Sequence, residues 1–337
     1  MKVLSVIVPC YNSQDYMRHC VDSLLTGGDN VEIIIVNDGS TDNTATIADE
    51  YASRFPHIVV VVHQQNAGHG GAINAGLKVA TGVYLKVVDS DDWVDEEAYA
   101  KVIENLLGFP EDRRPDMVIS NYVYEKVGKK HKAVVRYTGV LPEERLFTWD
   151  DIGSFGIGRY MLMHALIYRL DVLKKCSLRL PEHTFYVDNL YAYAPLVDVQ
   201  TMYYLNVNLY RYFIGREEQS VQERTMLRRV DQQLTVNKLM VESINLYGVP
   251  SDNKRDYLIH YLEIVTAVSS ILLLLEGTTS SINKKEALWQ YIKERDGRLY
   301  DRLRKGLPGR LLHIPSRVGR HIAIVIYRIA QMIVGFN

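Results

Sequence analysis

Short apolar runs alternate with segments of helical periodicity over the first hundred residues. Mainly apolar runs at 3–8, 31–36, 58–62 and 83–88 predict strands, and helical spacing predicts helices beginning near residues 16, 41 and 66. Mainly apolar runs are typical of strands that are covered on both faces. Strands that alternate with helices predict an α/β fold, with a mostly parallel sheet flanked by helices.

The pattern changes twice farther along the chain. Residues 117–212 mix strand-like stretches with turns and many tyrosines, and from residue 221 onward the apolar spacing is helical. A chain of 337 residues is long for one compact unit. We therefore expect an N-terminal α/β domain over residues 1–220 and a helical C-terminal region over 221–337.

Polar residues gather where the expected strands end. They are Asn12, Asp38, Asn66 and Asp89, one after each of the four runs. Ligands of open α/β sheets bind beyond the carboxyl ends of the strands. The four polar positions therefore predict one shared binding site at that edge of the sheet.

The acidic cluster Asp89-Ser90-Asp91-Asp92 carries the strongest chemical signal. If the chain stays extended through Ser90, Asp89 and Asp91 project to the same side. Paired carboxylates of this kind suit Mg²⁺ or Mn²⁺, which prefer oxygen ligands and bridge substrate phosphates. The alternative is a turn followed by a helix cap, with Asp92 serving only as that cap.

Composition excludes some classes of function. The formal net charge is −1, so no global positive charge favours nucleic acid as a partner. Three cysteines without a CxxC pair indicate free thiols in a reducing, cytoplasmic setting. The apolar start is short and interrupted by Pro9, which favours a first strand over a signal peptide.

Several motifs occur in a characteristic order. They are Ile7-Val8-Pro9-Cys10-Tyr11-Asn12, Asn37-Asp38-Gly39-Ser40, Asn66-Ala67-Gly68 with Asn74-Ala75-Gly76, and Asp89-Ser90-Asp91-Asp92. This order resembles glycosyltransferase family 2 over roughly the first hundred residues, and more weakly to about residue 221. The resemblance implies a GT-A, Rossmann-like fold, a nucleotide-diphosphate sugar donor such as a UDP-sugar, and a divalent metal, Mn²⁺ or Mg²⁺.

The resemblance also implies roles for single residues. Base and ribose would be held by Pro9, Tyr11, Asn12 and Asp38, while Asn66, Gly68, Asn74, Asp89 and Ser90 would contact the nucleotide sugar. Asp91 would ligate the metal, and Asp89 would serve the metal or the ribose. Ile73 stands where the family often has arginine before the second asparagine, so His69 or Lys86 would supply positive charge instead.

Two later positions match family features less fully. The family's catalytic base commonly lies in a Glu-Asp pair; here Val187 replaces the glutamate and Asp188 is retained. Asp188 would deprotonate the acceptor hydroxyl in an inverting reaction, or it would only cap the next helix. Arg216 lies in a segment that resembles a flexible loop and would contact the diphosphate, or the segment is a solvated charged loop.

The C-terminal segment is basic and amphipathic. No acidic residue follows Asp301, while seven lysines and arginines do, and apolar residues recur on one helical face between 317 and 334. Such a helix can lie on the anionic inner face of a cell membrane, or pack on the protein's own core or on another subunit of an oligomer.

We thus expect a metal-dependent glycosyltransferase that acts on a glycan, lipid-linked or polymer acceptor. The two alternatives are a sugar nucleotidyltransferase and a non-catalytic nucleotide-binding assembly subunit. A sugar nucleotidyltransferase usually has a glycine-rich loop with Arg and Lys after its first strand, and this chain has no such loop there. The only feature that favours a non-catalytic subunit is Val187, which replaces the glutamate of the Glu-Asp pair.

Overall fold

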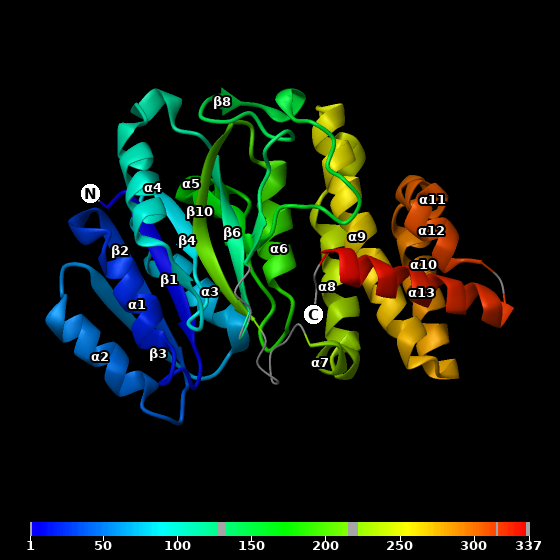
Figure 1. The fold of residues 1–337 in the computed structure, drawn as a ribbon, viewed down its shortest axis with the longest axis horizontal. Helices are drawn as coiled ribbons and strands as arrows, with labels where there is room; N and C mark the ends of the chain where they lie inside the picture. Colours follow the sequence, from blue (N-terminus) through cyan, green and yellow to red (C-terminus); the bar gives the residue numbers. More distant parts are fainter. Residues whose placement is uncertain (1, 127, 129–131, 215–221, 315, 335–337) are drawn as a thin grey trace. The chain divides into compact units, whose positions relative to one another are not determined.

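The computed structural model describes residues 2–126, 128, 132–214, 222–314 and 316–334 (Figure 1). The chain divides into two compact units. The first comprises residues 1–154 and 161–214, and the second comprises residues 155–160 and 215–337. The expected boundary near residues 215–222 falls almost wholly outside the described residues.

One large mixed sheet organises the first unit, with strand order β3-β2-β1-β4-β9-β6-β10-β5. Its strands are β1 (Leu4–Cys10), β2 (Val31–Asp38), β3 (Val59–Gln64), β4 (Tyr84–Val87), β5 (Trp93–Val94), β6 (Met117–Lys126), β7 (Ala133–Val135), β8 (Leu146–Phe147), β9 (Leu166–Arg169) and β10 (Met202–Ile214). Strands β1 to β4 are all parallel, and β1 pairs with β2 from Leu4↔Val31 to Cys10↔Asn37. The carboxyl ends of β1 and β2 therefore lie side by side, and β4 ends on the other side of β1.

Helices cover this sheet. They are α1 (Met17–Leu25), α2 (Thr44–Arg54), α3 (Gly68–Val79), α4 (Glu96–Gly108), α5 (Leu170–Lys175) and α6 (Asp188–Tyr193), with short 3₁₀ turns η1 (Gly28–Asn30), η2 (Glu111–Arg113), η3 (Trp149–Asp151), η4 (Met163–Ala165) and η5 (Ala194–Val197). The α/β fold expected from the sequence is confirmed. Strand β9 runs antiparallel to both β4 and β6, so one reversed strand lies between two strands that run in the same direction.

Two expected helix starts differ from the structure. Helix α2 begins at Thr44 with Asn43 as N-cap, so neither Ser40 nor Thr41 caps it. Those two residues instead bond to the turn after β1. The N-cap of α4 is Asp95, whose carboxylate accepts from the Ala98 backbone N–H at 3.1 Å. The interpretation of Asp92 as a helix cap was wrong, because β5 intervenes between Asp92 and that helix.

The second unit is helical. It contains α7 (Glu223–Arg228), α8 (Val230–Ser243), α9 (Asp252–Glu276), α10 (Thr279–Arg295), α11 (Gly297–Lys305), α12 (Leu307–Leu312), α13 (Ser316–Val334) and the 3₁₀ turn η6 (Leu246–Gly248). Ser251 caps the start of α9, and Gly277, with a φ of 68°, ends it in the left-handed conformation. The inserted residues 155–160 join this unit through ring contacts of Phe155 with Tyr257 and of Tyr160 with Tyr261.

Helix α9 forms the centre of the second unit. It is the one helix among the described residues that is long and apolar enough to cross a membrane, and 67% of its most apolar window is buried within the protein. Burial of this extent is typical of a core helix. The packing of α8, α10 and α12 against α9 gives the same indication.

Candidate active site

The turn after β1 is fixed by bonds to the turn after β2. Asn12 has a φ of 49°, and its N–H donates to Ser40 Oγ at 3.0 Å while its Oδ1 accepts from the Thr41 N–H at 2.8 Å. Pro9 is buried inside β1, whereas the ring of Tyr11 is 54% exposed. The two turns thus hold an open aromatic face at the edge of the sheet.

Asp38 ends β2 and organises the start of α3. Its Oδ1 accepts from Gln64 Nε2 at 2.7 Å and from the Ala67 N–H at 2.8 Å, and its Oδ2 accepts from the Gly68 N–H at 2.8 Å. Asn66 Nδ2 donates to the Asp38 carbonyl at 3.0 Å. A carboxylate offers about four acceptor positions, so Asp38 keeps capacity for a further donor.

Helix α3 is joined tightly to the segment that leads to Asp188. Gly68 has a φ of +74°, and a Cβ there would lie 2.9 Å from the backbone N of His183. Six residues later, Asn74 Nδ2 donates to the Leu180 carbonyl at 2.8 Å, and Asn74 Oδ1 accepts from the Leu180 N–H at 3.0 Å. Both side-chain groups of Asn74 are therefore engaged with the backbone of that segment.

Asp89 follows β4 and lies beside His69 of α3. His69 Nε2 is 2.9 Å from Asp89 Oδ1. Burial opposes ionisation of Asp89, but the neighbouring His69 outweighs it and lowers the carboxyl pKa. Burial likewise opposes the charge on His69, while Asp89, and then Asp188 and Asp38, raise the His69 pKa above its usual value. His69, one of the two residues predicted to supply positive charge in place of the family's arginine, thus lies beside Asp89 with a raised pKa.

Asp92 is a buried support for the neighbouring strand. Its Oδ2 accepts from the Tyr210 hydroxyl at 2.5 Å and its Oδ1 from the Phe213 N–H at 2.7 Å, both from β10. Burial and the charge of Asp89 raise the Asp92 pKa well above its usual value. Ser90 Oγ lies 2.8 Å from Ser13 Oγ, which ties the acidic loop to the turn after β1.

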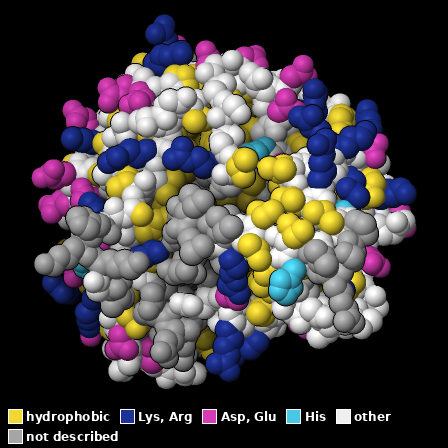
Figure 2. Space-filling view, turned by 45° about the vertical axis from the view of Figure 1, so that its right-hand side comes forward, with side chains coloured by type: hydrophobic (Ala, Val, Ile, Leu, Met, Phe, Trp, Pro, Cys, Tyr) yellow, Lys and Arg dark blue, Asp and Glu magenta, His cyan; other side chains and the backbone are white. Residues whose placement is uncertain are grey.

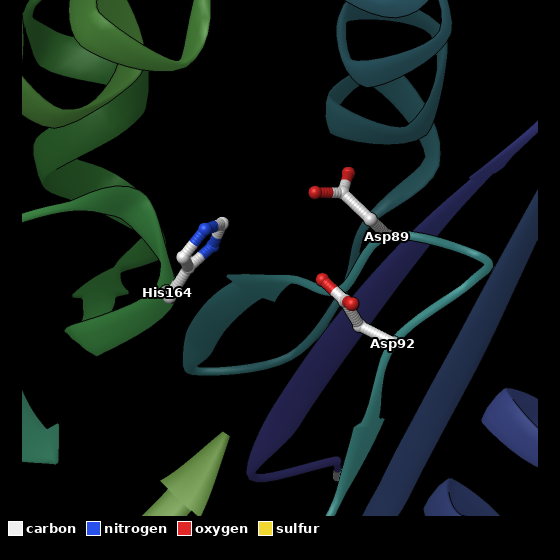
Figure 3. A group of neighbouring side chains, drawn as sticks. All are labelled: Asp89, Asp92 and His164. Carbon is white, nitrogen blue, oxygen red and sulfur yellow. The ribbon is translucent and has the colours of Figure 1, made fainter. Parts of the chain in front are cut away.

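The structure adds a histidine that the sequence did not indicate. His164, from η4, lies with Asp89 and Asp92 so that one ligand atom of each falls within 4.8 Å of the others (Figure 3). The His164 ring stacks on Tyr210 at 4.6 Å, and its buried Nδ1 has no partner in the described part of the chain. Burial lowers the His164 pKa to about 4, so the ring is neutral and able to donate a lone pair.

These residues fit a divalent cation in part. Two carboxylates and a neutral imidazole with an unpartnered nitrogen form an acceptable donor set, although both Asp92 oxygens already accept hydrogen bonds from β10. This group shares Asp89 with the pair predicted from the sequence and has Asp92 and His164 in place of Asp91. Ligation by Asp91, which is partly exposed on the same loop, stays a prediction.

Lys86 lies within the core beneath the site. It is fully buried, its Nζ donates to the His164 carbonyl at 2.7 Å, and it lies 5.0 Å from the Tyr210 ring centre. Burial lowers its pKa to about 7, against the opposing influence of Asp89. Because the Lys86 ammonium is buried and bonded to a backbone carbonyl, Lys86 would act on a ligand through its charge and not through direct contact.

Asp188 comes to this site from a position about a hundred residues farther along the chain. It is the first residue of α6, after the buried N-cap Val187. Burial raises the Asp188 pKa, as does Asp89, whereas His69 lowers it. Asp89, His69 and Asp188 are thus close enough to interact electrostatically. Arg216 lies outside the described residues.

Comparisons with known proteins identify the family and the fold of this chain. Residues 5–169 match the model of the family described as glycosyl transferase family 2. The chain is 34% identical to the uncharacterized glycosyltransferase YibD of Escherichia coli over 221 residues, which cover 63% of this chain and 61% of YibD. It is 28% identical to the putative glycosyltransferase EpsH of Bacillus subtilis, covering 82% of this chain and 78% of EpsH.

Other relatives are matched over a smaller share of their length. Glycosyltransferase GlyA of Streptococcus pneumoniae is 30% identical over 63% of this chain, which spans only 31% of GlyA. Among solved structures, residues 1–349 of Staphylococcus aureus TarS match with a TM-score of 0.70 and 22% identity, over 97% of this chain and 89% of that one. This likeness establishes a shared fold.

Proposed function

The chain belongs to glycosyl transferase family 2 through its GT-A domain, and from this premise we propose that it transfers a sugar from a nucleotide-diphosphate donor, a UDP-sugar, to an acceptor hydroxyl. The reaction inverts the anomeric centre. The acceptor is a glycan, a lipid-linked intermediate or a cell-surface polymer. Relatives include the minor teichoic acid biosynthesis protein GgaB of B. subtilis, which is in keeping with a polymer acceptor.

One observation carries the proposal. Asp89 lies 2.9 Å from His69, and Asp188, about a hundred residues farther along the chain, is near enough to act on the pKa of His69. A scaffold needs no such cluster for stability, because charges brought together with little water are costly. Perturbed carboxylates gathered in this way are typical of catalytic sites.

The donor would lie along the turns that follow β1, β2 and β4. The exposed face of Tyr11 would stack on the base, and the remaining acceptor capacity of Asp38 would receive an N–H of the base or a hydroxyl of the ribose. A TarS structure was determined in complex with UDP-GlcNAc, and a Pyrobaculum calidifontis mannosyltransferase of the same fold in complex with GDP-Man and Mn²⁺.

Asp89 with Asp91, Asp92 or His164 would hold a divalent metal, Mn²⁺ or Mg²⁺. When bound, such a metal neutralises charge on the diphosphate and so favours its departure. His69 contributes from the protein side, because its raised pKa favours a positive charge next to Asp89. The ion pair also holds the Asp89 carboxylate in a defined orientation.

Asp188 would act as the base. Its carboxylate accepts the proton of the acceptor hydroxyl as the hydroxyl oxygen bonds to the anomeric carbon, and the bond from that carbon to the diphosphate oxygen breaks. The nucleoside diphosphate leaves with the bonding electrons. A raised pKa makes a carboxylate a stronger base, and burial raises that of Asp188.

Two measurements on the full chain test this proposal. Thermal shift with a panel of nucleotide sugars, with and without Mn²⁺, should show stabilisation by a UDP-sugar that increases with metal. With that donor, Asp188→Asn should retain donor binding and lose roughly 10²–10⁴-fold in turnover. Asp198→Asn, at an acidic residue that pairs with Lys175 at 2.8 Å, is the matched control and should keep its rate. Near-normal turnover in Asp188→Asn would remove Asp188 as the base.

The C-terminal helix has the features of a membrane-surface helix. It rests on its own unit through the small residues Gly319 and Ala323, which are buried. Its large residues Ile322, Val325 and Ile326 remain 39–50% exposed. Figure 2 shows hydrophobic side chains gathered in a patch, with lysine and arginine side chains beside it. We propose that this face lies on an anionic membrane at the cytoplasmic side, where lipid-linked acceptors are accessible. A subunit contact of a homo-oligomer is the competing use of the same face.

A further inference from the structure

Lys285 occupies an unusual place in the helical unit. It lies on the face of α10 that is otherwise formed by Leu288, Trp289 and Ile292, all of them buried, and it is itself only 8% exposed. Its neighbour Lys284, by contrast, points outward and pairs with Asp231 at 2.6 Å. Lysine is rarely buried unless it is paired. The position of Lys285 therefore calls for an anionic partner.

The protein supplies no such partner among the residues that the structure describes. Lys285 makes no hydrogen bond or ion pair there. The nearby charges are Glu286, which is exposed, and the guanidinium groups of Arg304 and Arg320. Burial lowers the Lys285 pKa, and the two arginines lower it further, against the opposing Glu286. The side chain is largely buried and its ammonium has no partner, so the ammonium is poorly solvated near two other cations, and this unfavourable arrangement points to an anionic ligand.

A pocket opens beside this lysine. It has a volume of about 370 Å³, which lies in the range of small-ligand sites. Its lining combines cationic and apolar side chains: Lys285, Arg320, His313, Glu286, Leu274, Ile282, Leu312 and Ile314. His313 is neutral, because burial lowers its pKa to about 4 and outweighs the hydrogen bond between Nδ1 and the Gly309 carbonyl, 2.8 Å away, which favours the protonated ring. The pocket therefore combines two cations and the carboxylate of Glu286 with four aliphatic side chains.

We infer that this pocket binds a phosphate group attached to an apolar chain, that is, the phosphate of a lipid. Lys285 and Arg320 would bind the phosphate oxygens, and Leu274, Ile282 and Ile314 would contact the first carbons of the chain. Arg320 belongs to α13, the helix that carries the exposed apolar residues. The inference extends the proposed membrane-surface role of this helix and is independent of the transfer chemistry.

Binding of a soluble lipid phosphate to the full chain tests the inference. The probe is dihexanoyl phosphatidic acid below its micelle concentration, added after UDP and Mn²⁺ so that the donor site is occupied. Titration should show saturable binding and a rise in melting temperature. Lys285→Met should weaken the binding roughly tenfold or more, since a charge-assisted bond is lost. Lys305→Met removes the same charge from an exposed position of this unit and should bind like the unchanged protein.

The melting temperature without lipid separates a ligand site from a structural lysine. Because Lys285 has no partner to lose, Lys285→Met should melt at the same or a higher temperature. A clear fall in that temperature would mean that Lys285 is held by the protein itself and would overturn the inference. Equal binding by inorganic phosphate alone would overturn the lipid assignment, and equal binding by Lys285→Met would overturn the site. None of these readouts depends on sugar transfer, so a failure of the proposed transferase activity would be seen separately.

Discussion

The substitution Asn74→Ala tests whether this residue positions Asp188 or contacts the donor. In the structure both amide groups of Asn74 bond to the backbone of Leu180, which is buried. Removing them leaves one N–H and one carbonyl without partners, at roughly 1–3 kcal/mol each. Alanine has a higher helix propensity than asparagine, which raises the free energy of unfolding by about 0.5 kcal/mol. We therefore expect a net loss of about 1.5–5.5 kcal/mol in the free energy of unfolding.

For a unit of about 200 residues this loss lowers the melting temperature by roughly 3–20 °C. The matched control is Asn105→Ala in α4, because Asn105 is also partly buried but makes only a local bond to Lys101 within its own helix. Scanning calorimetry of both variants measures the difference. Turnover and donor affinity, measured separately, should show a lower kcat and an unchanged Kd for the donor. A weakened donor Kd with an unchanged melting temperature would refute this reasoning and restore the direct nucleotide contact that the sequence predicted.

Three further outcomes follow from the site. Tyr11→Ala should weaken donor binding by about 1–3 kcal/mol, as measured by calorimetric titration, because a stacking face is lost; Tyr11→Phe should bind normally. Asp91→Asn should abolish the stabilisation of the donor complex by Mn²⁺ without changing the melting temperature of the free protein. Asp92→Ala should lower the melting temperature of the free protein, because the hydroxyl of Tyr210 loses its acceptor. The unfolded chain protonates His164 near pH 6.5 but the folded chain only near pH 4, so in metal-free buffer stability should fall as the pH is lowered through this interval. In His164→Phe that part of the decrease, up to about 3 kcal/mol, should disappear from denaturant titrations.

The parallel part of the sheet could be predicted from the sequence because local patterns determine it. The apolar runs become β1, β2, β3 and β4 within about two residues of the expected ends. The position of the binding edge follows from chain direction alone, so Asp38 and Asp89 could be placed at one edge without coordinates. The family resemblance and the fold class are likewise confirmed.

Other features depend on contacts between distant segments and carry no local signal. His164 stands in a short 3₁₀ turn without a motif, and only the packing of β9 beside β4 brings it to Asp89. Lys86 lies in the middle of an apolar strand, where the sequence does not reveal whether its ammonium faces a ligand or the carbonyls of the core. Asn74 lies within a motif of the donor site, yet the structure engages it with Leu180, more than a hundred residues away.

The six residues 155–160 determine how this protein can be divided. They belong to the helical unit through Phe155 and Tyr160, although residues of the first unit precede and follow them in the sequence. A fragment that starts after residue 214 would lack the rings that pack on Tyr257 and Tyr261, and a fragment that ends there would expose them. The segments of the two units thus alternate along the sequence. Recombination at a single crossover after residue 154 or 214 would separate residues 155–160 from their own helical unit or from their matching sequence context, and the apolar contacts of Phe155 and Tyr160 would be lost or mismatched. Chimeras with relatives should therefore exchange this short insert together with the C-terminal helices.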